Sequence, residues 1–374
     1  MDPRAYWLGF NLVKGIGSVR LQGLLNYFGS LEIAWQSPPE AFQASGLSSK
    51  VIENLVRVRG KVDLEAELEK ILSKNIQILT WESKEYPRRL KEIDQPPPVL
   101  YVRGDLTLED EWAVAIVGTR RVTAYGRQMA EELAGYLAGN GITVVSGLAR
   151  GVDGLAHKAA LAAGGRSIAV LGSGVDHIYP PEHRNLADEI CANGAVISDY
   201  APGTPPEGVN FPPRNRIISG LSLAVIVVEA GKKSGALITA KFAADQGRDV
   251  FAIPGNVHAP QSIGTNQLIQ DGARPLLQPK DVLEALNLQQ IQEYRAARHV
   301  IPSDEVEAKL IEILRTEPVH VDELSRAAGY SVQKVSAALT MLELKGVVRQ
   351  VGGMQYVMAR EVRAVYETGN RSED

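Results

Sequence analysis

The stretch FPPRNRIISGLS, residues 211–222, places an aromatic residue and two prolines before an Arg-Asn-Arg triplet. Arg214 and Arg216 could bind anionic oxygens, because a guanidinium presents a planar fork of N–H donors that matches a phosphate group. Phe211 could stack on an exposed base. The prolines also suit the first turn of a helix, so that part of the motif could serve the fold alone. The donors and the ring together favour a site for a nucleic-acid backbone.

Three other loops carry glycines, cations or both. The candidates are Arg120 and Arg121 in VGTRRVTAYGR, Gly172, Ser173, Gly174, Tyr179 and Arg184 in LGSGVDHIYPPEHR, Asn215 in the opening motif, and Lys232 and Lys233 in EAGKKSGALITA. Glycines let a backbone approach an anion closely, and helix N-termini direct unpaired N–H groups towards it. A single arginine is more often a surface group, whereas four such loops at one sheet edge favour a shared site.

Six apolar, β-branched runs predict the strands that bring these loops together. They are AVAIVG (113–118), ITVVSG (142–147), SIAVLG (167–172), AVISD (195–199), LAVIVVE (223–229) and DVFAIPG (249–255). Helix-compatible segments separate them, which predicts an α/β, Rossmann-like, doubly wound, mainly parallel sheet. In the common strand order 3-2-1-4-5-6, strands one and four are neighbours. We then expect Arg120 and Arg121 to face Arg214 and Arg216 across one crevice.

The composition limits the possible classes of protein. The chain has 374 residues, so two or three domains are expected, and its formal net charge of −4 requires that any anion site be a local concentration of cations. No apolar run is long enough for a membrane span and the N-terminus lacks a signal pattern, so no membrane partner is expected. Cys191 is the only cysteine, which favours a reducing, cytoplasmic location.

The pattern along the chain predicts five segments. A helical domain, similar to SAM or helix-hairpin-helix modules, is expected at 1–80, and its Gly-Ile-Gly turn could approach a phosphate or could simply connect two helices. The Rossmann-like domain is expected at 81–287, followed by a linker at 288–302. Helices and a glycine-turned hairpin predict a winged helix at 303–361, and a flexible tail is expected at 362–374.

Two nucleotide-binding motifs fail on inspection. GKKSG at 231–235 lacks the earlier glycine of a P-loop, since Ile226 stands there. GSGVDH lacks the third glycine of the dinucleotide fingerprint, where His177 stands. No metal-ligand spacing or catalytic set emerges, so no cofactor, metal or catalytic residue is expected.

Seven motifs in order resemble the bacterial DNA-processing protein A (DprA/Smf) family over roughly residues 80 to 280. They are IVGTRRVTAYG, SGLARGVDGLAH, GSGVDHIYPPEHRNL, FPPRNRIISGLS, EAGKKSGALITA, GRDVFAIPG and GTNQLIQDGA. The resemblance implies an extended Rossmann fold that binds single-stranded DNA and dimerises through that fold. It further implies protection of incoming DNA in natural transformation and loading of a RecA-type recombinase. Carried over by motif, the DNA pocket includes Arg120, the 172–174 turn, Arg184, Arg214 and Arg216.

Three positions depart from the family's usual residues. Thr123 replaces Ser and Asp199 replaces Glu, which keep the hydroxyl and the charge. Ala236 replaces Ser and removes a hydroxyl near Lys233, which weakens the expectation of an anion role for that loop.

Two other functions remain open from the residues alone. A nucleotide phosphoribohydrolase-like enzyme would fit the fold, with Glu229 as its one candidate acid, but the chain lacks the PGGxGTxxE signature. A transcriptional regulator would use the winged helix, but residues 304–360 hold 8 acidic and 7 basic residues, without the cationic excess expected of a duplex reader.

Overall fold

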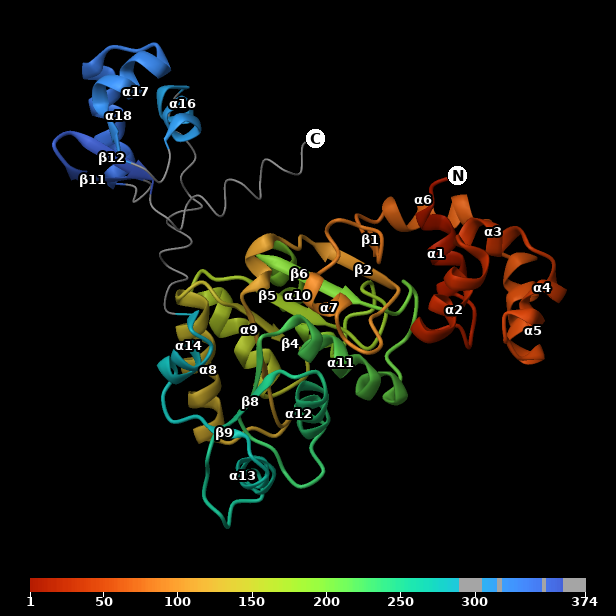
Figure 1. Cartoon of the computed structure of the whole chain (residues 1–374). Helices are drawn as coiled ribbons and strands as arrows, with labels where there is room; N and C mark the ends of the chain where they lie inside the picture. Colours follow the sequence, from red (N-terminus) through yellow and green to blue (C-terminus); the bar gives the residue numbers. More distant parts are fainter. Residues whose placement is uncertain (289–304, 315–317, 345–347, 359–374) are drawn as a thin grey trace. The chain divides into compact units, whose positions relative to one another are not determined.

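The computed structural model describes residues 1–288, 305–314, 318–344 and 348–358 (Figure 1). The chain forms two compact units, Met1–Val282 and Leu283–Asp374. The predicted linker after Leu288 and the predicted tail at 362–374 lie outside the described residues. In the described part of the chain, no helix has both the length and the apolar character needed to cross a membrane.

A nine-stranded sheet forms the centre of the first unit, in the order β1-β2-β6-β5-β4-β3-β7-β8-β9. Its strands are β1 (Gln77–Thr80), β2 (Val99–Gly104), β3 (Ala113–Val117), β4 (Thr143–Ser146), β5 (Ser167–Val170), β6 (Gly194–Ser198), β7 (Ala224–Val227), β8 (Asp249–Ala252) and β9 (Arg274–Pro275). From β6 to β9 all neighbours are parallel, whereas β2 is antiparallel to both β6 and β1. The predicted α/β fold with a mainly parallel sheet is confirmed.

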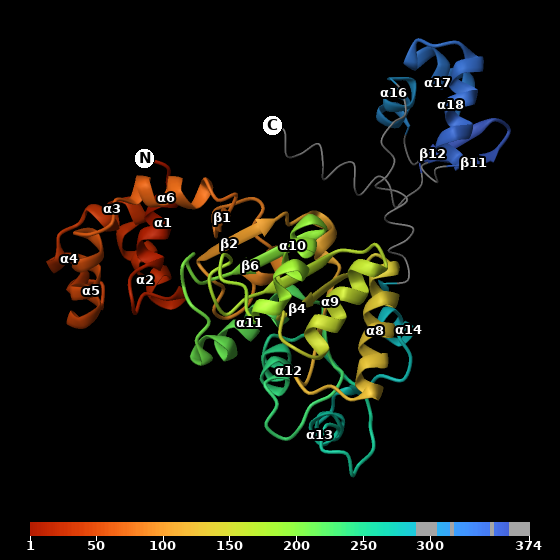
Figure 2. The same ribbon diagram turned by 180° about the vertical axis from the view of Figure 1, so that it is seen from behind.

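Helices cover both faces of this sheet (Figures 1 and 2). They are α7 (Arg88–Lys91), α8 (Ala124–Gly139), α9 (Val152–Ala162), α10 (Arg184–Ala192), α11 (Phe211–Leu221), α12 (Ala236–Asp245), α13 (Ile263–Gln270) and α14 (Lys280–Ala285), with 3₁₀ turns at Leu108–Glu111, Pro181–His183 and Gly208–Asn210. α8, α9 and α10 pack together on one face, and α11 packs beside α12 on the other. Every residue of β3 to β7 is buried, as the continuous apolar runs require of a sheet covered on both sides.

The expected strand order 3-2-1-4-5-6 is wrong. The fourth predicted strand is β6, which pairs with β5 and not with β3. The fifth predicted strand is β7, and it pairs with β3. After β6 the chain crosses back over the sheet through a long loop and α11, so the order reverses between β3 and β7. This pair of strands is the topological switch point, where doubly wound sheets bind ligands.

Six helices precede the sheet, where helices were predicted. They are α1 (Arg4–Asn11), α2 (Ser18–Phe28), α3 (Leu31–Gln36), α4 (Pro39–Ala44), α5 (Ser49–Arg59) and α6 (Leu64–Leu72). The Arg59 guanidinium lies 5.2 Å from the ring centre of Trp35 and 4.9 Å from that of Phe42, which ties α5 to α3 and α4. Residues 77–80, which the prediction places at the end of the helical domain, form β1 of the sheet.

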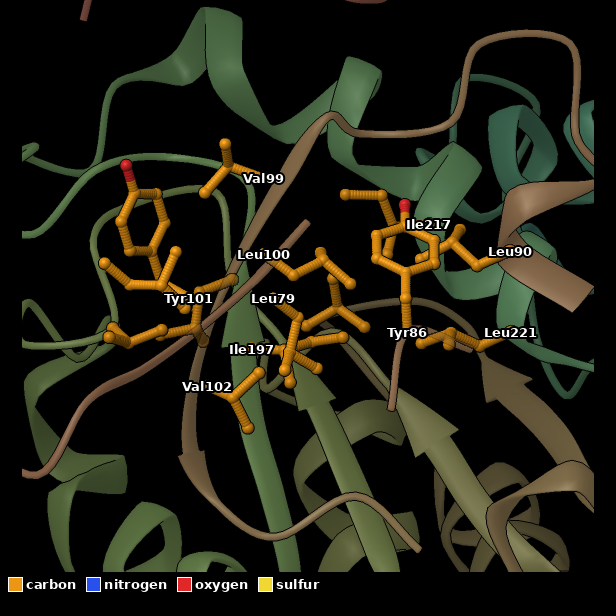
Figure 3. Packing of buried hydrophobic residues seen from close by; sticks show 14 of the residues in the cluster. Leu79, Tyr86, Leu90, Val99, Leu100, Tyr101, Val102, Ile197, Ile217 and Leu221 are labelled. Atoms are coloured by element: carbon orange, nitrogen blue, oxygen red, sulfur yellow. The ribbon is translucent and has the colours of Figure 1, made fainter. Parts of the chain in front are cut away.

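Strands β1 and β2 were not predicted, and they extend the core beyond the six parallel strands. Figure 3 shows Leu79, Tyr101 and Val102 from these strands beside Ile197 of β6. The same core continues to Tyr86 and Leu90, which pack near Ile217 and Leu221 of α11 (Figure 3). The helix that carries the Arg-Asn-Arg triplet is therefore anchored by buried side chains along its second half.

The second unit has the predicted winged-helix elements. They are α16 (Glu305–Ile313), β10 (Val319–His320), α17 (Val321–Ala328), α18 (Val332–Leu344), β11 (Val348–Gly352) and β12 (Gln355–Met358), with the strands in the order β10-β12-β11. Leu310, Leu324 and Leu339 are fully buried and join the three helices in one small core. Gly353 and Met354 form the turn of the hairpin with positive φ angles, and Gly352 at the end of β11 also has a positive φ.

A glycine at the start of β6 provides a test of this architecture. A Cβ on Gly194 would lie 2.0 Å from the Ser167 carbonyl oxygen of the neighbouring strand, and backbone cannot move aside as a side chain can. We expect Gly194→Ala to lower the free energy of unfolding by about 2–3 kcal/mol. All four tryptophans lie at or before position 112, so their fluorescence during urea denaturation reports on the first unit.

Gly135→Ala is the matched control. Gly135 lies within α8, and a Cβ there meets nothing within 4 Å. The same substitution should therefore leave the protein as stable or stabilise it by up to about 1 kcal/mol. Equal effects of the two substitutions would contradict the packing of β6 on β5.

Candidate functional site

A cavity of about 730 Å³ lies at the carboxyl ends of the parallel strands. Val117 at the end of β3 and residues 118–120 after it form one wall, and the loop 231–235 after β7 forms another. The start of α11 and the loop after β5 also contribute. The cavity therefore lies at the switch point between β3 and β7, and its size is in the range of small-ligand pockets. The loops that the sequence singled out do meet at one edge.

The opening motif forms the first turn of α11. Pro212 and Pro213 follow Phe211 in the first turn of the helix, where a missing N–H leaves no hydrogen bond unmade. Phe211, which begins the helix, lines the cavity together with Pro212, Arg214 and Asn215. The structural and the ligand-binding interpretations of the motif are thus compatible, because the prolines begin the helix that presents the ring.

Phe211 is the centre of an aromatic and cationic cluster. Its ring centre lies 5.8 Å from that of Tyr179, and the two planes are tilted by 39°. The guanidinium carbon of Arg120 lies 5.7 Å from the Phe211 ring centre, and that of Arg214 lies 6.0 Å from it. Gly172 permits this packing, since a Cβ there would lie 2.9 Å from the ring. Arg120, Tyr179 and Phe211 line the main cavity and a small adjoining one.

Arg214 lines the cavity but is only 5% exposed. Its guanidinium donates to the carbonyl of Gly147 at 3.1 Å and to the carbonyl of Val170. Its Nε donates to the Asn215 side chain at 3.2 Å. Burial lowers the pKa of Arg214 to about 10, and the charge of Asp153 opposes that shift. The N–H donors of Arg214, which were predicted to bind phosphate, therefore largely bind the protein's own backbone.

Arg216 does not face Arg120 across the cavity as expected. Its guanidinium pairs with Asp199 at 3.0 Å, and both side chains are less than a fifth exposed. The two arginines of the triplet are two positions apart on a helix, so they project in different directions. Arg216 is absent from the cavity wall.

Five other predicted positions are also absent from the cavity wall: Arg121, Gly172, Ser173, Gly174 and Arg184. Arg121 and Arg184 are exposed and do not line it. Ser173 is buried, and its hydroxyl donates to the carbonyl of His177 at 2.7 Å. Gly174 packs against the backbone of the loop after β6, where a Cβ would lie 2.8 Å from the Ala201 carbonyl oxygen. The 172–174 turn thus supports the loops and leaves no open cradle for an anion.

Lys232 and Lys233 are exposed and line the cavity. The chain from Gly231 to Gly235 leads into α12, so the lysines stand beside the N-terminus of that helix. Asn215, the remaining predicted residue, lines the same wall and donates to the Gly235 carbonyl at 3.4 Å. The α11 and β7–α12 contributions to the site are joined through this contact.

Two residues of the site were missed from the sequence. Asp153 lines the cavity, is 7% exposed and accepts hydrogen bonds from the amides of Gly147 and Ala149. Burial raises the pKa of its carboxyl, and Arg214 opposes that shift. Arg150, in the adjoining cavity, forms an exposed ion pair with Glu182 at 2.5 Å. Their shared motif, LARGVDG, contains a charge on each side of a glycine, which is the signal that could have indicated them.

Glu229, the candidate acid of the enzyme hypothesis, is hydrogen-bonded to the start of α8. It is 3% exposed and accepts hydrogen bonds from the Thr123 amide, at 2.9 Å, and from the Thr123 hydroxyl. Thr123 is the N-cap of α8, so the carboxylate stabilises the start of that helix. Within the described ranges, no group of three or more histidine, cysteine and acidic residues could hold a metal ion.

Comparisons with known proteins agree with this architecture. A model of the DNA recombination-mediator protein A family matches residues 77–287, and a model of the DprA winged helix domain matches residues 295–354. Protein Smf of Synechocystis sp. is 38% identical over an alignment of 392 residues, which covers 95% of this chain and 98% of the relative.

Two solved structures are similar to more than half of the chain. The X-ray structure of DNA processing protein A from Streptococcus pneumoniae is 36% identical with a TM-score of 0.66, covering 75% of this chain and 97% of that one. DNA processing protein A from Helicobacter pylori, solved for its single-stranded DNA binding mode, is 35% identical with a TM-score of 0.51, covering 56% and 95%. The sheet, the winged helix and matches along most of the chain lead to one conclusion: the chain belongs to the DNA recombination-mediator protein A family.

Proposed function

We propose that this protein binds single-stranded DNA in the cavity at the switch point. The observation that carries the proposal is the pairing of Phe211 and Tyr179 beside Arg120, with Lys232 and Lys233 on the opposite loop. Aromatic faces accept any base by stacking, and cations follow the phosphates. The H. pylori relative, whose structure was solved for single-stranded DNA binding, supports the same ligand class.

Three exposed cations supply the phosphate contacts in this proposal. Arg120, Lys232 and Lys233 are exposed, and none forms an ion pair with any residue that the structure describes. An exposed cation gives up little hydration when it meets a phosphate, and it releases the counterions condensed on the strand. Because base edges are left unread, sequence preference is weak.

The wider role that we propose is recombination mediation. The protein would protect incoming single strands in the cytoplasm and transfer them to a RecA-type recombinase, acting as a homodimer through the Rossmann-like unit. Membership of the recombination-mediator family supports this role. The enzyme hypothesis gains no support, because the Glu229 carboxylate is hydrogen-bonded to Thr123. The transcriptional-regulator hypothesis gains none either, because α18 contains a single basic residue, Lys334.

Replacing the aromatic face should weaken binding of bases. Phe211→Leu keeps the apolar character but removes the π-face, so affinity for a fluorescently labelled oligo(dT) should fall about 5- to 150-fold, as expected for the loss of roughly 1–3 kcal/mol of stacking. Fluorescence anisotropy measures the change. Tyr136→Leu, at an exposed site on α8, is the matched control and should bind like wild type. Equal affinities of the two variants would refute the stacking role of Phe211.

The salt dependence of the affinity for single-stranded DNA should report the number of phosphate contacts. With three cations, the slope of log Kd against log salt concentration should have a magnitude of about 2, since each single-strand contact contributes roughly 0.7. Arg120→Gln should reduce that magnitude by about 0.7. Arg88→Gln removes an exposed arginine of α7, which is absent from the cavity wall, and should leave the slope unchanged. An unchanged slope in Arg120→Gln would remove that residue from the phosphate path.

Recombinase loading is tested with purified components. On a single strand coated with single-strand-binding protein, the wild type should shorten the lag before RecA-type ATP hydrolysis begins. The Arg120→Gln/Phe211→Leu variant should not shorten it, because the strand is no longer held. No effect of wild type over a range of concentrations would contradict the mediator role while leaving DNA binding intact.

A further inference from the structure

Arg214 differs from the other cations of the site in its surroundings. Arg120, Lys232 and Lys233 are exposed, whereas Arg214 is 5% exposed. A buried guanidinium has already lost its hydration and its counterions on folding. It can therefore contribute little of the counterion release that drives phosphate binding.

The guanidinium of Arg214 connects the ends of two neighbouring strands. Gly147 follows β4 directly, and Val170 is the last residue of β5. Arg214 donates to the carbonyl of each. The chain returns across the sheet through α11 after β6. This side chain therefore fixes where the first turn of α11 lies relative to the carboxyl ends of β4 and β5.

The guanidinium is tightly packed on the side that faces Gly147 and Asp153. Asp153 accepts from the Gly147 amide at 3.1 Å, and its negative charge favours the charged form of Arg214. A Cβ on Gly147 would lie 2.8 Å from both Nη2 of Arg214 and Oδ2 of Asp153. The guanidinium is therefore held from this side, and its carbon lies 6.0 Å from the ring centre of Phe211.

We propose that Arg214 is a positioning residue that holds the Phe211 ring at the base-stacking position and does not itself bind phosphate. This inference rests on the proposed function, in which Phe211 stacks on a base. The ring begins α11, three residues before the arginine, so a displaced guanidinium displaces the first turn of the helix and the ring with it. The affected interaction is base stacking, while the phosphate contacts of Arg120 and the two lysines persist.

The test compares two single-stranded ligands, oligo(dT) and an oligomer of abasic deoxyribose phosphates of the same length. The abasic oligomer presents the phosphates without bases, so the ratio of the two affinities measures stacking. Arg214→Lys keeps the charge, but one ammonium group cannot supply both the Nη1 contacts with the two carbonyls and the Nε contact with Asn215. We expect affinity for oligo(dT) to fall about tenfold, with abasic affinity and salt slope unchanged.

Gly147→Ala is the second variant, because it displaces the guanidinium while leaving every charge in place. It should reproduce the loss on oligo(dT) and spare the abasic oligomer. Arg216→Lys is the matched control on the same helix, paired with Asp199 and away from the cavity, and its affinity ratio should equal that of wild type. In the Phe211→Leu background, Arg214→Lys should cause no further loss, because the two act through the same ring.

Three outcomes would overturn the inference. One is an equal loss on both ligands with a salt slope reduced by about 0.7, which would make Arg214 a phosphate contact. Another is unchanged oligo(dT) affinity in folded Arg214→Lys and Gly147→Ala. The third is full additivity with Phe211→Leu. The proposed function fails separately, when wild type itself binds neither ligand or binds both equally.

Discussion

The opposite charges of Arg214 and Asp153, which are buried near one another and attract each other, are the constraint on which the edge of the sheet depends. Both side chains are at least nine-tenths buried, and a buried charge without a partner is strongly destabilising. The arginine satisfies its donors with strand-end carbonyls, and the aspartate satisfies its acceptors with loop amides. The carboxyl ends of β4 and β5 and the start of α11 are therefore fixed relative to one another.

The reversal of strand order explains why distant loops meet at this edge. The chain adds β3 to β6 in one direction and then returns through α11 to place β7 beside β3. The loop after β3 and the loop after β7 thus become neighbours, although Arg120 and Lys232 are 112 residues apart in the sequence. The crossover helix passes over the same edge and contributes Phe211 to the cavity between them.

Charges in this site are divided between two environments with different physical roles. The buried charges of Arg214 and Asp153 are held by hydrogen bonds and by their mutual attraction. They determine the position of the first turn of α11. The exposed cations are the ones that the proposed function assigns to phosphates, and in that proposal they determine affinity and its salt dependence. A formal net charge of −4 is compatible with an anion site for this reason, because three exposed cations around one cavity produce a local positive field.

The sequence by itself determined the fold class, the strand positions from 113 to 255, the winged helix and the family, since apolar periodicity and ordered motifs are local properties. It also indicated Arg120, Tyr179, Phe211 and the two lysines as residues of one site. Only the tertiary structure decided the strand order and the separate environments of Arg214 and Arg216. A sequence shows that an arginine is present, but whether it meets water, a carboxylate or a backbone carbonyl depends on the chain segments that pack around it.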